Sequence, residues 1–146
     1  MRSTTLRRLA PFVGLALVIL VFAFLTGAPA QYLSVPHLRI VLAQTVIVAI
    51  GAVGMTMIIV SGGIDLSVGS TIALTSVAAA LALHRSWPPV AAVTASIVLG
   101  GLMGAVNGLV ITRLRVVPFI ATLGMLGVAR GGAKWLAGEM TVPAPE

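Results

Sequence analysis

The sequence predicts an all-α integral membrane protein with about five transmembrane helices and a cytoplasmic N-terminus. Hydrophobic residues make up 59% of its 146 residues and charged residues only 8%, with a mean hydropathy of +1.15. A soluble domain usually carries about 25% charged residues. The charges stand at the ends of long apolar segments, and a helix needs roughly 20 apolar residues to cross a bilayer.

The positive charge does not indicate nucleic-acid binding. The net charge is +6, but the arginines occur in ones to threes beside apolar segments, where membrane proteins place them. The sequence has no cysteine, which excludes disulfides and thiolate metal sites. His37 and His84 stand alone beside chain breaks, and we expect them to be exposed loop residues. No metal site is predicted.

The first predicted span covers residues 9–28 and follows a short basic N-terminal segment. Ala28-Pro29-Ala30 resembles a signal-peptidase site. The apolar run from Leu9 to Leu25 is longer than a usual signal core, and further apolar segments follow. These observations favour an uncleaved span, followed by a loop over residues 29–39.

The second and third spans, residues 40–60 and 66–83, are separated by a very short joint. The joint consists of Ser61, Gly62, Gly63 and Asp65, with Ile64 between the last two. Two glycines permit a tight reversal of the chain. Asp65 can cap the following helix by accepting hydrogen bonds from the amides of its first turn.

Asp65 also allows a functional interpretation. It is the only formal charge between Arg39 and Arg85. A carboxylate at membrane depth often marks a substrate path or a coupling site. The two roles are compatible, because a capped helix end can also face a cavity. The sequence leaves both open.

The fourth span, residues 90–111, carries small residues at every fourth position, which places them on one helical face. They are Ala92, Ser96, Gly100, Gly104 and Gly108. Such a face typically packs closely against another helix, and we expect that role here. Asn107 lies at the end of this face. It is predicted either to hydrogen-bond across the packed pair or to line a substrate path.

The fifth span, residues 119–137, contains Arg130 and Lys134. Both side chains can snorkel to the interface. Alternatively, Arg130 faces a watery substrate path.

The distribution of positive charge predicts the orientation. With the N-terminus inside, five loop arginines lie in the cytoplasm: Arg2, Arg7, Arg8, Arg113 and Arg115. Only Arg39 and Arg85 then lie in outer loops, as the positive-inside rule requires. The Asp65 joint therefore lies toward the cytoplasm.

No pattern in the sequence indicates an enzyme. It lacks a phosphate-binding loop, paired carboxylates and a nucleophile beside a base. We therefore predict no catalytic residue and no cofactor bound by this chain, and any ATP must act on a partner subunit.

Two motifs carry a family resemblance. GMTMIIVSGGIDLSVGS (54–70) and NGLVITRLRVVPFIATLGMLGVARG (107–131) resemble permease subunits of bacterial ABC importers for ribose, xylose, arabinose and galactose. The branched-chain amino acid permeases are more distant relatives. The resemblance covers about residues 31–146. It implies a multi-pass permease of the bacterial inner membrane that imports a monosaccharide.

The resemblance also implies partners. These are a second permease subunit, identical or different, a cytoplasmic ATP-binding subunit and a periplasmic or extracellular sugar-binding protein. Family members have about ten spans, so the chain corresponds to the N-terminal half of a permease. The alternatives are a truncated, non-transporting remnant or assembly partner, and a permease for a signalling molecule derived from a sugar.

Reporter fusions test the predicted topology. Fusions after Arg39, Arg85 and Glu146 should report an external location, and a fusion after Arg115 an internal one, because of the arginine bias. An alkaline phosphatase and green fluorescent protein pair provides the measurement. External phosphatase activity after Arg115 would contradict the five-span topology.

Overall fold

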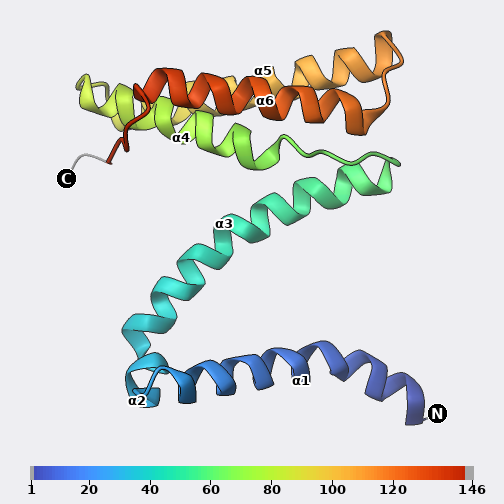
Figure 1. The fold of residues 1–146 in the computed structure, drawn as a ribbon, viewed down its shortest axis with the longest axis vertical. Coiled ribbons are helices and arrows are strands. Elements are labelled where there is room, and N and C mark those ends of the chain that lie inside the picture. Colours follow the sequence, from blue (N-terminus) through green and yellow to red (C-terminus); the bar gives the residue numbers. More distant parts are fainter. Residues whose placement is uncertain (1, 144–146) are drawn as a thin grey trace. The chain divides into compact units, whose positions relative to one another are not determined.

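The computed structural model describes residues 2–143, and every regular element in that range is an α-helix (Figure 1). The helices are α1 (Arg2–Leu25), α2 (Pro29–Tyr32), α3 (Val35–Val60), α4 (Val68–His84), α5 (Pro89–Arg113) and α6 (Pro118–Ala137). They divide into two compact units, with the boundary inside α3 between Ile50 and Gly51. The first unit contains α1, α2 and the start of α3, and the second contains the rest.

Prolines set several helix starts. Helices α2, α5 and α6 have proline at the first or second position, and Pro36 is the second residue of α3. The amide groups of the first turn have no partner within the helix, so proline is tolerated there. Helices α3, α5 and α6 consequently begin before the predicted spans 40–60, 90–111 and 119–137. Helix α1 ends at Leu25, earlier than predicted.

The second unit is built on α4, α5 and α6, which run in alternating directions and pack against one another (Figure 1). Its small core contains Leu74 of α4 with Ala129 and Ala133 of α6. A Cβ atom built on Gly132 would lie 3.5 Å from Leu74 Cδ1. Small residues on α6 therefore make room for a leucine of α4, as is common between membrane helices.

The end of α3 has a specific geometry. Gly62 adopts a positive φ of 83°, and its N–H donates to the carbonyl of Ile59 at 2.9 Å. The N–H of Gly63 donates to the carbonyl of Ile58 at 3.0 Å. This pair of bonds is the Schellman motif, which satisfies the last carbonyls of a helix and favours glycine at the left-handed position.

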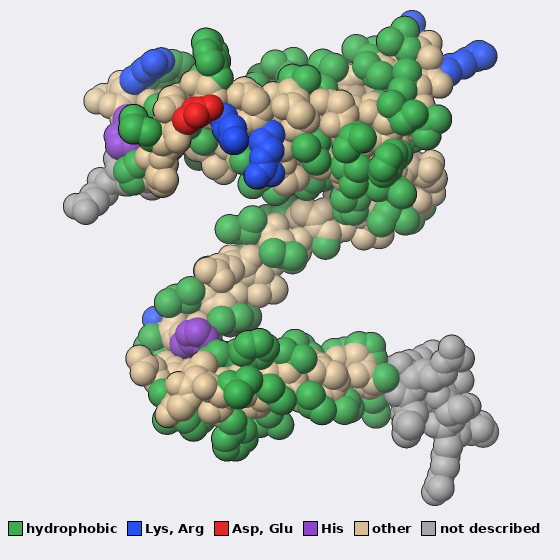
Figure 2. All heavy atoms as spheres, in the orientation of Figure 1, with side chains coloured by type: hydrophobic (Ala, Val, Ile, Leu, Met, Phe, Trp, Pro, Cys, Tyr) green, Lys and Arg blue, Asp and Glu red, His purple; other side chains and the backbone are tan. Residues whose placement is uncertain are grey.

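Two helices, α3 and α5, are long and apolar enough to cross a membrane. The apolar part of α1, Leu9–Leu25, and helix α4 are apolar but shorter. Large hydrophobic side chains are exposed along the helices, and hydrophobic atoms cover much of the surface in Figure 2. Exposed apolar surface of this extent indicates contact with lipid or with other helices. The number of spans, about five, stays a prediction.

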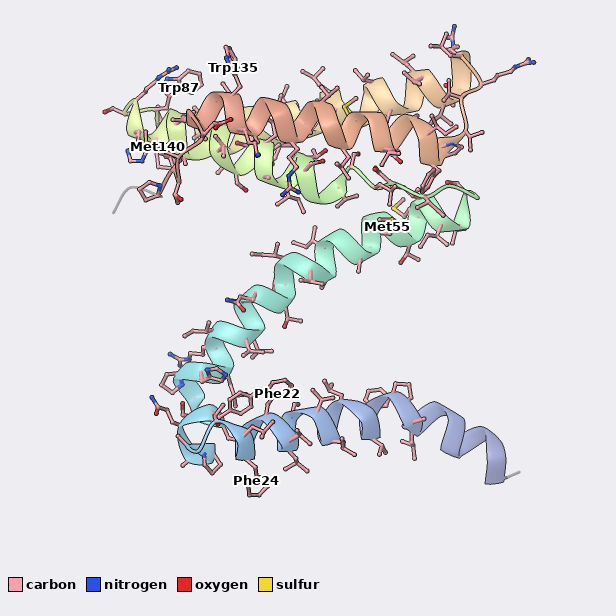
Figure 3. All side chains as sticks on the ribbon, in the orientation of Figure 1. Phe22, Phe24, Met55, Trp87, Trp135 and Met140 are labelled. Atoms are coloured by element: carbon pink, nitrogen blue, oxygen red, sulfur yellow. The ribbon has the colours of Figure 1, made fainter. Side chains whose placement is uncertain are left out.

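Two tryptophans lie at the same end of the second unit. Trp87 precedes α5 and Trp135 is in the last turn of α6 (Figure 3). Their side chains are 50% and 81% exposed. Tryptophan is enriched at the headgroup level of membranes, so this end is suited to an interface.

The expectation that both histidines are exposed loop residues is wrong. His37 is in the first turn of α3 and half-buried, because the helix begins at Val35. Its ring packs against Tyr32, with the ring centroids 4.9 Å apart. His84 is exposed but is the last residue of α4, and its Nε2 lies 2.8 Å from the carbonyl oxygen of Pro143.

Substitution of Gly62 tests the Schellman motif. Gly62→Ala should lower the free energy of unfolding by about 1–2 kcal/mol, because alanine is strained at a positive φ. The measurement is titration of the purified protein in mixed micelles with dodecyl sulfate, followed by circular dichroism. The control is Gly69→Ala within α4, where a Cβ meets no atom within 4 Å. Equal effects of the two substitutions would contradict this role of Gly62.

Candidate functional site

The predicted joint forms a non-helical segment between α3 and α4, from Ser61 to Ser67. It appears as the thin green segment before α4 in Figure 1. Backbone N–H and C=O groups outside a helix are costly in a bilayer unless the protein satisfies them. The question is therefore where the polar groups of this segment find partners.

Asp65 stabilises the turn that leads into α4. Its Oδ1 accepts hydrogen bonds from the N–H of Ser67 at 2.7 Å and from the Ser67 hydroxyl at 2.6 Å. Ser67 is the N-cap residue of α4. The sequence suggested that Asp65 accepts from the amides of the first turn of α4. In the structure it accepts instead from Ser67, the residue that precedes this turn. Its short side chain reaches the amide two residues on, which is an Asx turn.

Asn107 connects α5 to the start of α4. Its Nδ2 donates to the Ser67 hydroxyl at 3.0 Å, and both residues are buried. The Ser67 hydroxyl thus accepts from Asn107 and donates to Asp65. The expected bond from Asn107 across a helix pair corresponds to this contact.

Thr122 connects α6 to the same segment. Its Oγ1 accepts from the N–H of Leu66 at 3.2 Å and lies 3.1 Å from the carbonyl oxygen of Ile64. The side chain is buried, at 2% exposure. Asp65, Ser67, Asn107 and Thr122 form one polar cluster, which connects the joint to α4, α5 and α6.

A groove of about 410 Å³ opens beside this cluster. Its apolar walls include Ile58, Ile64 and Ile111. Its polar and small lining residues are Ser61, Gly63, Asp65, Gly104, Asn107, Gly108, Thr112 and Thr122. We call it the Asp65 groove. A mainly apolar groove with a few convergent polar groups is typical of a binding site.

Ser67 and Thr122 were missed by the sequence analysis. Ser67 follows Asp65 closely enough to be recognised as its turn partner. Thr122 gives no local signal, because its partners Ile64 and Leu66 are remote in sequence.

The small-residue face of α5 is only partly covered. Ser96 donates to the carbonyl of Thr75 in α4 at 3.2 Å, and a Cβ on Gly100 would lie 3.6 Å from Thr75 Cγ2. A Cβ on Gly104 or Gly108 would meet no atom within 4 Å. The first half of the face therefore packs against α4, whereas the second half lines the Asp65 groove.

Arg130 lies apart from the cluster. It is eight residues beyond Thr122 on α6, more than two helical turns, and is exposed, as is Lys134. The structure does not bring Arg130 to the Asp65 groove, and its role in a substrate path stays a prediction.

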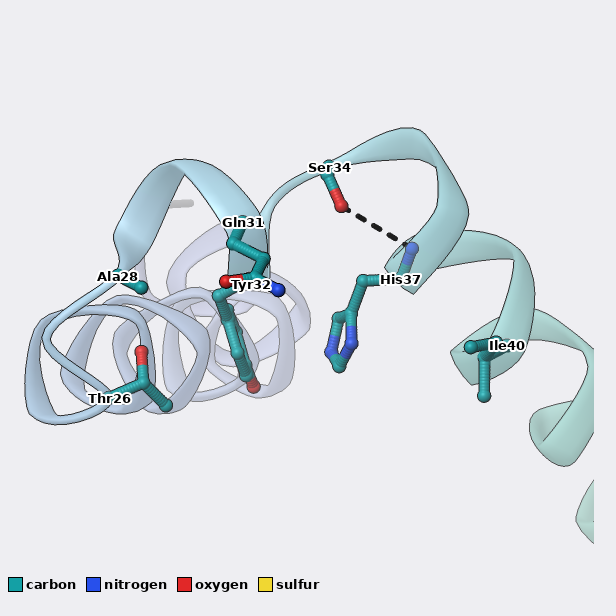
Figure 4. A pocket seen from close by; sticks show the side chains of 7 residues that line it. All are labelled: Thr26, Ala28, Gln31, Tyr32, Ser34, His37 and Ile40. Carbon is teal, nitrogen blue, oxygen red and sulfur yellow. Dashed lines mark hydrogen bonds between the residues drawn. The ribbon is translucent and has the colours of Figure 1, made fainter.

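The first unit has a pocket of its own, of about 400 Å³ (Figure 4). It is lined by residues around α2, including Gln31, Tyr32 and His37. None of the predicted site residues lies in it. The N–H of His37 is 3.5 Å from the Ser34 hydroxyl, so the pocket wall is held by a local helix-start contact.

A family model described as the permease component of the branched-chain amino acid transport system matches residues 37–144. The chain belongs to this permease family. The match includes the joint, the polar cluster and the whole of α4, α5 and α6.

The chain is similar to permease proteins of two import systems. The ribose import permease protein RbsC of Escherichia coli K12 is 42% identical over 117 residues, covering 80% of this chain and 36% of RbsC. The autoinducer 2 import system permease protein LsrC of Salmonella typhi is 35% identical over 131 residues, covering 86% of this chain and 38% of LsrC. The chain thus spans less than two fifths of these relatives' length. No solved structure matches it.

Removal of the Thr122 hydroxyl tests the cluster. Thr122→Val should lower the free energy of unfolding in micelles by about 1 kcal/mol, because it removes the acceptor of the half-buried Leu66 N–H. The matched control is Thr94→Val, whose exposed hydroxyl bonds only the carbonyl of Val90 in its own helix. The control should change stability by less than about 0.5 kcal/mol. A Thr122→Val protein as stable as the control would contradict the tie between α6 and the joint.

Proposed function

We propose that this permease is a membrane-spanning component of an ABC importer that moves a monosaccharide, ribose-like or related, into the cytoplasm. The similarity to the ribose import permease RbsC, at 42% identity over 80% of the chain, is the observation that carries the proposal. The apolar helices and the polar cluster at the α3–α4 joint support it. In this arrangement, non-helical backbone with several of its hydrogen bonds made by the protein lies beside a groove, as at the binding sites of transporters.

The chain is proposed to cross the bacterial inner membrane five times, with its N-terminus in the cytoplasm, as half of a permease of about ten spans. The proposed partners are a second permease subunit, a cytoplasmic ATP-binding subunit and an external sugar-binding protein. ATP is hydrolysed on the partner subunit. This chain itself is not an enzyme.

The second substrate candidate is a signalling molecule derived from a sugar. The similarity to LsrC, which is named as an autoinducer 2 import permease, favours it. The Asp65 groove presents carboxylate and carboxamide groups, which suit hydroxylated ligands of either kind.

A second candidate function is a non-transporting membrane component or assembly partner. The limited share of the relatives' length that the chain covers supports this candidate. It predicts membrane insertion without sugar uptake in any context.

A chimera distinguishes these functions. The region of RbsC that matches this chain is replaced by residues 31–146, in an Escherichia coli strain that lacks RbsC. We expect ATP-dependent uptake of labelled ribose by the chimera, because the matched region carries the same permease motifs. Uptake of labelled autoinducer 2 is measured in the corresponding LsrC chimera.

The controls are RbsC without the matched region and the 146-residue chain expressed alone, neither of which should support uptake. Membrane-inserted chimeras that take up neither ligand would overturn the proposed transport function.

A further inference from the structure

We infer that the Asp65 groove is a docking site for a transmembrane helix that carries a hydrogen-bond donor. The proposed helix belongs to the part of a family permease that lies outside the region matched by this chain. The inference rests on the proposed function only for the identity of this partner. The geometry of the groove is independent of the substrate.

The small-residue face of α5 provides the first argument. Gly100 in this face already lies against Thr75 of α4, so the face is used for helix packing in this protein. Gly104 and Gly108 continue the same face but have open space where a Cβ would stand. Glycines that face open space permit the close approach of another helix backbone, which is how membrane helices associate.

Unused hydrogen-bonding groups provide the second argument. Asp65 uses only Oδ1 in its bonds to Ser67, and its second oxygen has no partner in residues 9–143, whose side chains the structure describes. Asn107 is 6% exposed, and its carboxamide oxygen also makes no hydrogen bond within this range. No fully enclosed side-chain nitrogen or oxygen of the described residues lacks a partner, so this oxygen is not fully enclosed, and Asn107 is one of the residues that line the groove.

The acceptor oxygens of Asp65 and Asn107 determine which kind of partner helix is complementary to the groove. Asp65 makes no ion pair within the described residues, and the groove offers two acceptor oxygens beside small and apolar residues. An acceptor at membrane depth is stabilised by a donor on a neighbouring helix. The complementary surface is therefore a helix with a hydroxyl, amide or basic side chain flanked by small residues.

The relatives are longer than this chain, and their additional sequence is the proposed source of the partner helix. This chain covers 36% of RbsC and 38% of LsrC, so a family permease contains much more chain than the described bundle. A helix from that portion lies in the same membrane at high effective concentration. A sugar in the groove is the competing occupant.

Thiol labelling tests the docking, because the sequence has no cysteine of its own. Thr112→Cys places a single thiol in the groove, and Leu114→Cys places one on a residue that is 70% exposed, two positions further. The full chain is expressed alone or with the part of RbsC that follows the matched region. Maleimide labelling rates are measured in inside-out vesicles, with the presence of both chains verified by immunoblot.

Co-expression should slow the labelling of Thr112→Cys by about tenfold, because a packed helix interface excludes water, and that of Leu114→Cys by less than about twofold. Asp65→Asn keeps the acceptor of the Asx turn but replaces the second oxygen with an amide donor. It should weaken the protection of Thr112→Cys about threefold, the effect of losing one interhelical hydrogen bond.

Unchanged labelling of Thr112→Cys, or equal slowing at both positions, would overturn the docking site. Full protection in the Asp65→Asn background would overturn the role of the acceptor. Protection of the chain alone by ribose would instead assign the groove to a sugar. Protection by the co-expressed segment without ribose uptake by the chimera would leave the docking site standing while the transport function fails.

Discussion

The chain leaves α3 at Val60 and enters α4 at Val68, and the backbone between them must be satisfied without a helix. In a bilayer the protein itself has to provide those hydrogen bonds. Thr122 accepts a hydrogen bond from the amide of Leu66, and Asp65 accepts one from the amide of Ser67. The arrangement of α4, α5 and α6 depends on this requirement, because Asn107 of α5 and Thr122 of α6 both bond the short segment that leads into α4.

The hydrophobic contacts alone would not specify this arrangement. The core of the second unit is small, with Leu74 against Ala129 and Ala133, and lipid competes equally well for apolar side chains. Close packing of small residues and interhelical hydrogen bonds are the forces that remain. The bond from Asn107 to Ser67 and the bonds from Thr122 to the joint therefore orient α5 and α6 relative to the start of α4. The alanines and Gly132 allow α4 and α6 to approach each other closely.

Much of the helical architecture could be predicted from the sequence, because apolar segments and chain breaks are local signals. The joint at Gly62 was predictable for the same reason. The helix starts were less so, because Pro36 and Pro89 lie outside the predicted spans 40–60 and 90–111 and instead occupy first-turn positions of α3 and α5. The polar cluster was predicted only in its Asp65 and Asn107 members. Thr122 joins it through contacts with remote residues, which no local pattern reveals.

The small-residue face shows the same limit of local reasoning. Its four-residue period predicts that five residues lie on one side of α5. It does not predict how many of them α4 covers. That depends on the path of α4, which contacts Ser96 and Gly100 through Thr75 and leaves Gly104 and Gly108 open.

The identity of residue 65 can be understood from the two oxygens of its side chain. The Asx turn requires a single acceptor, Oδ1, and an asparagine could supply it equally well. A carboxylate differs from a carboxamide only at the second position, where it offers an acceptor instead of a donor. Asparagine at position 65 would therefore keep the geometry of the joint and change only the group at the second position.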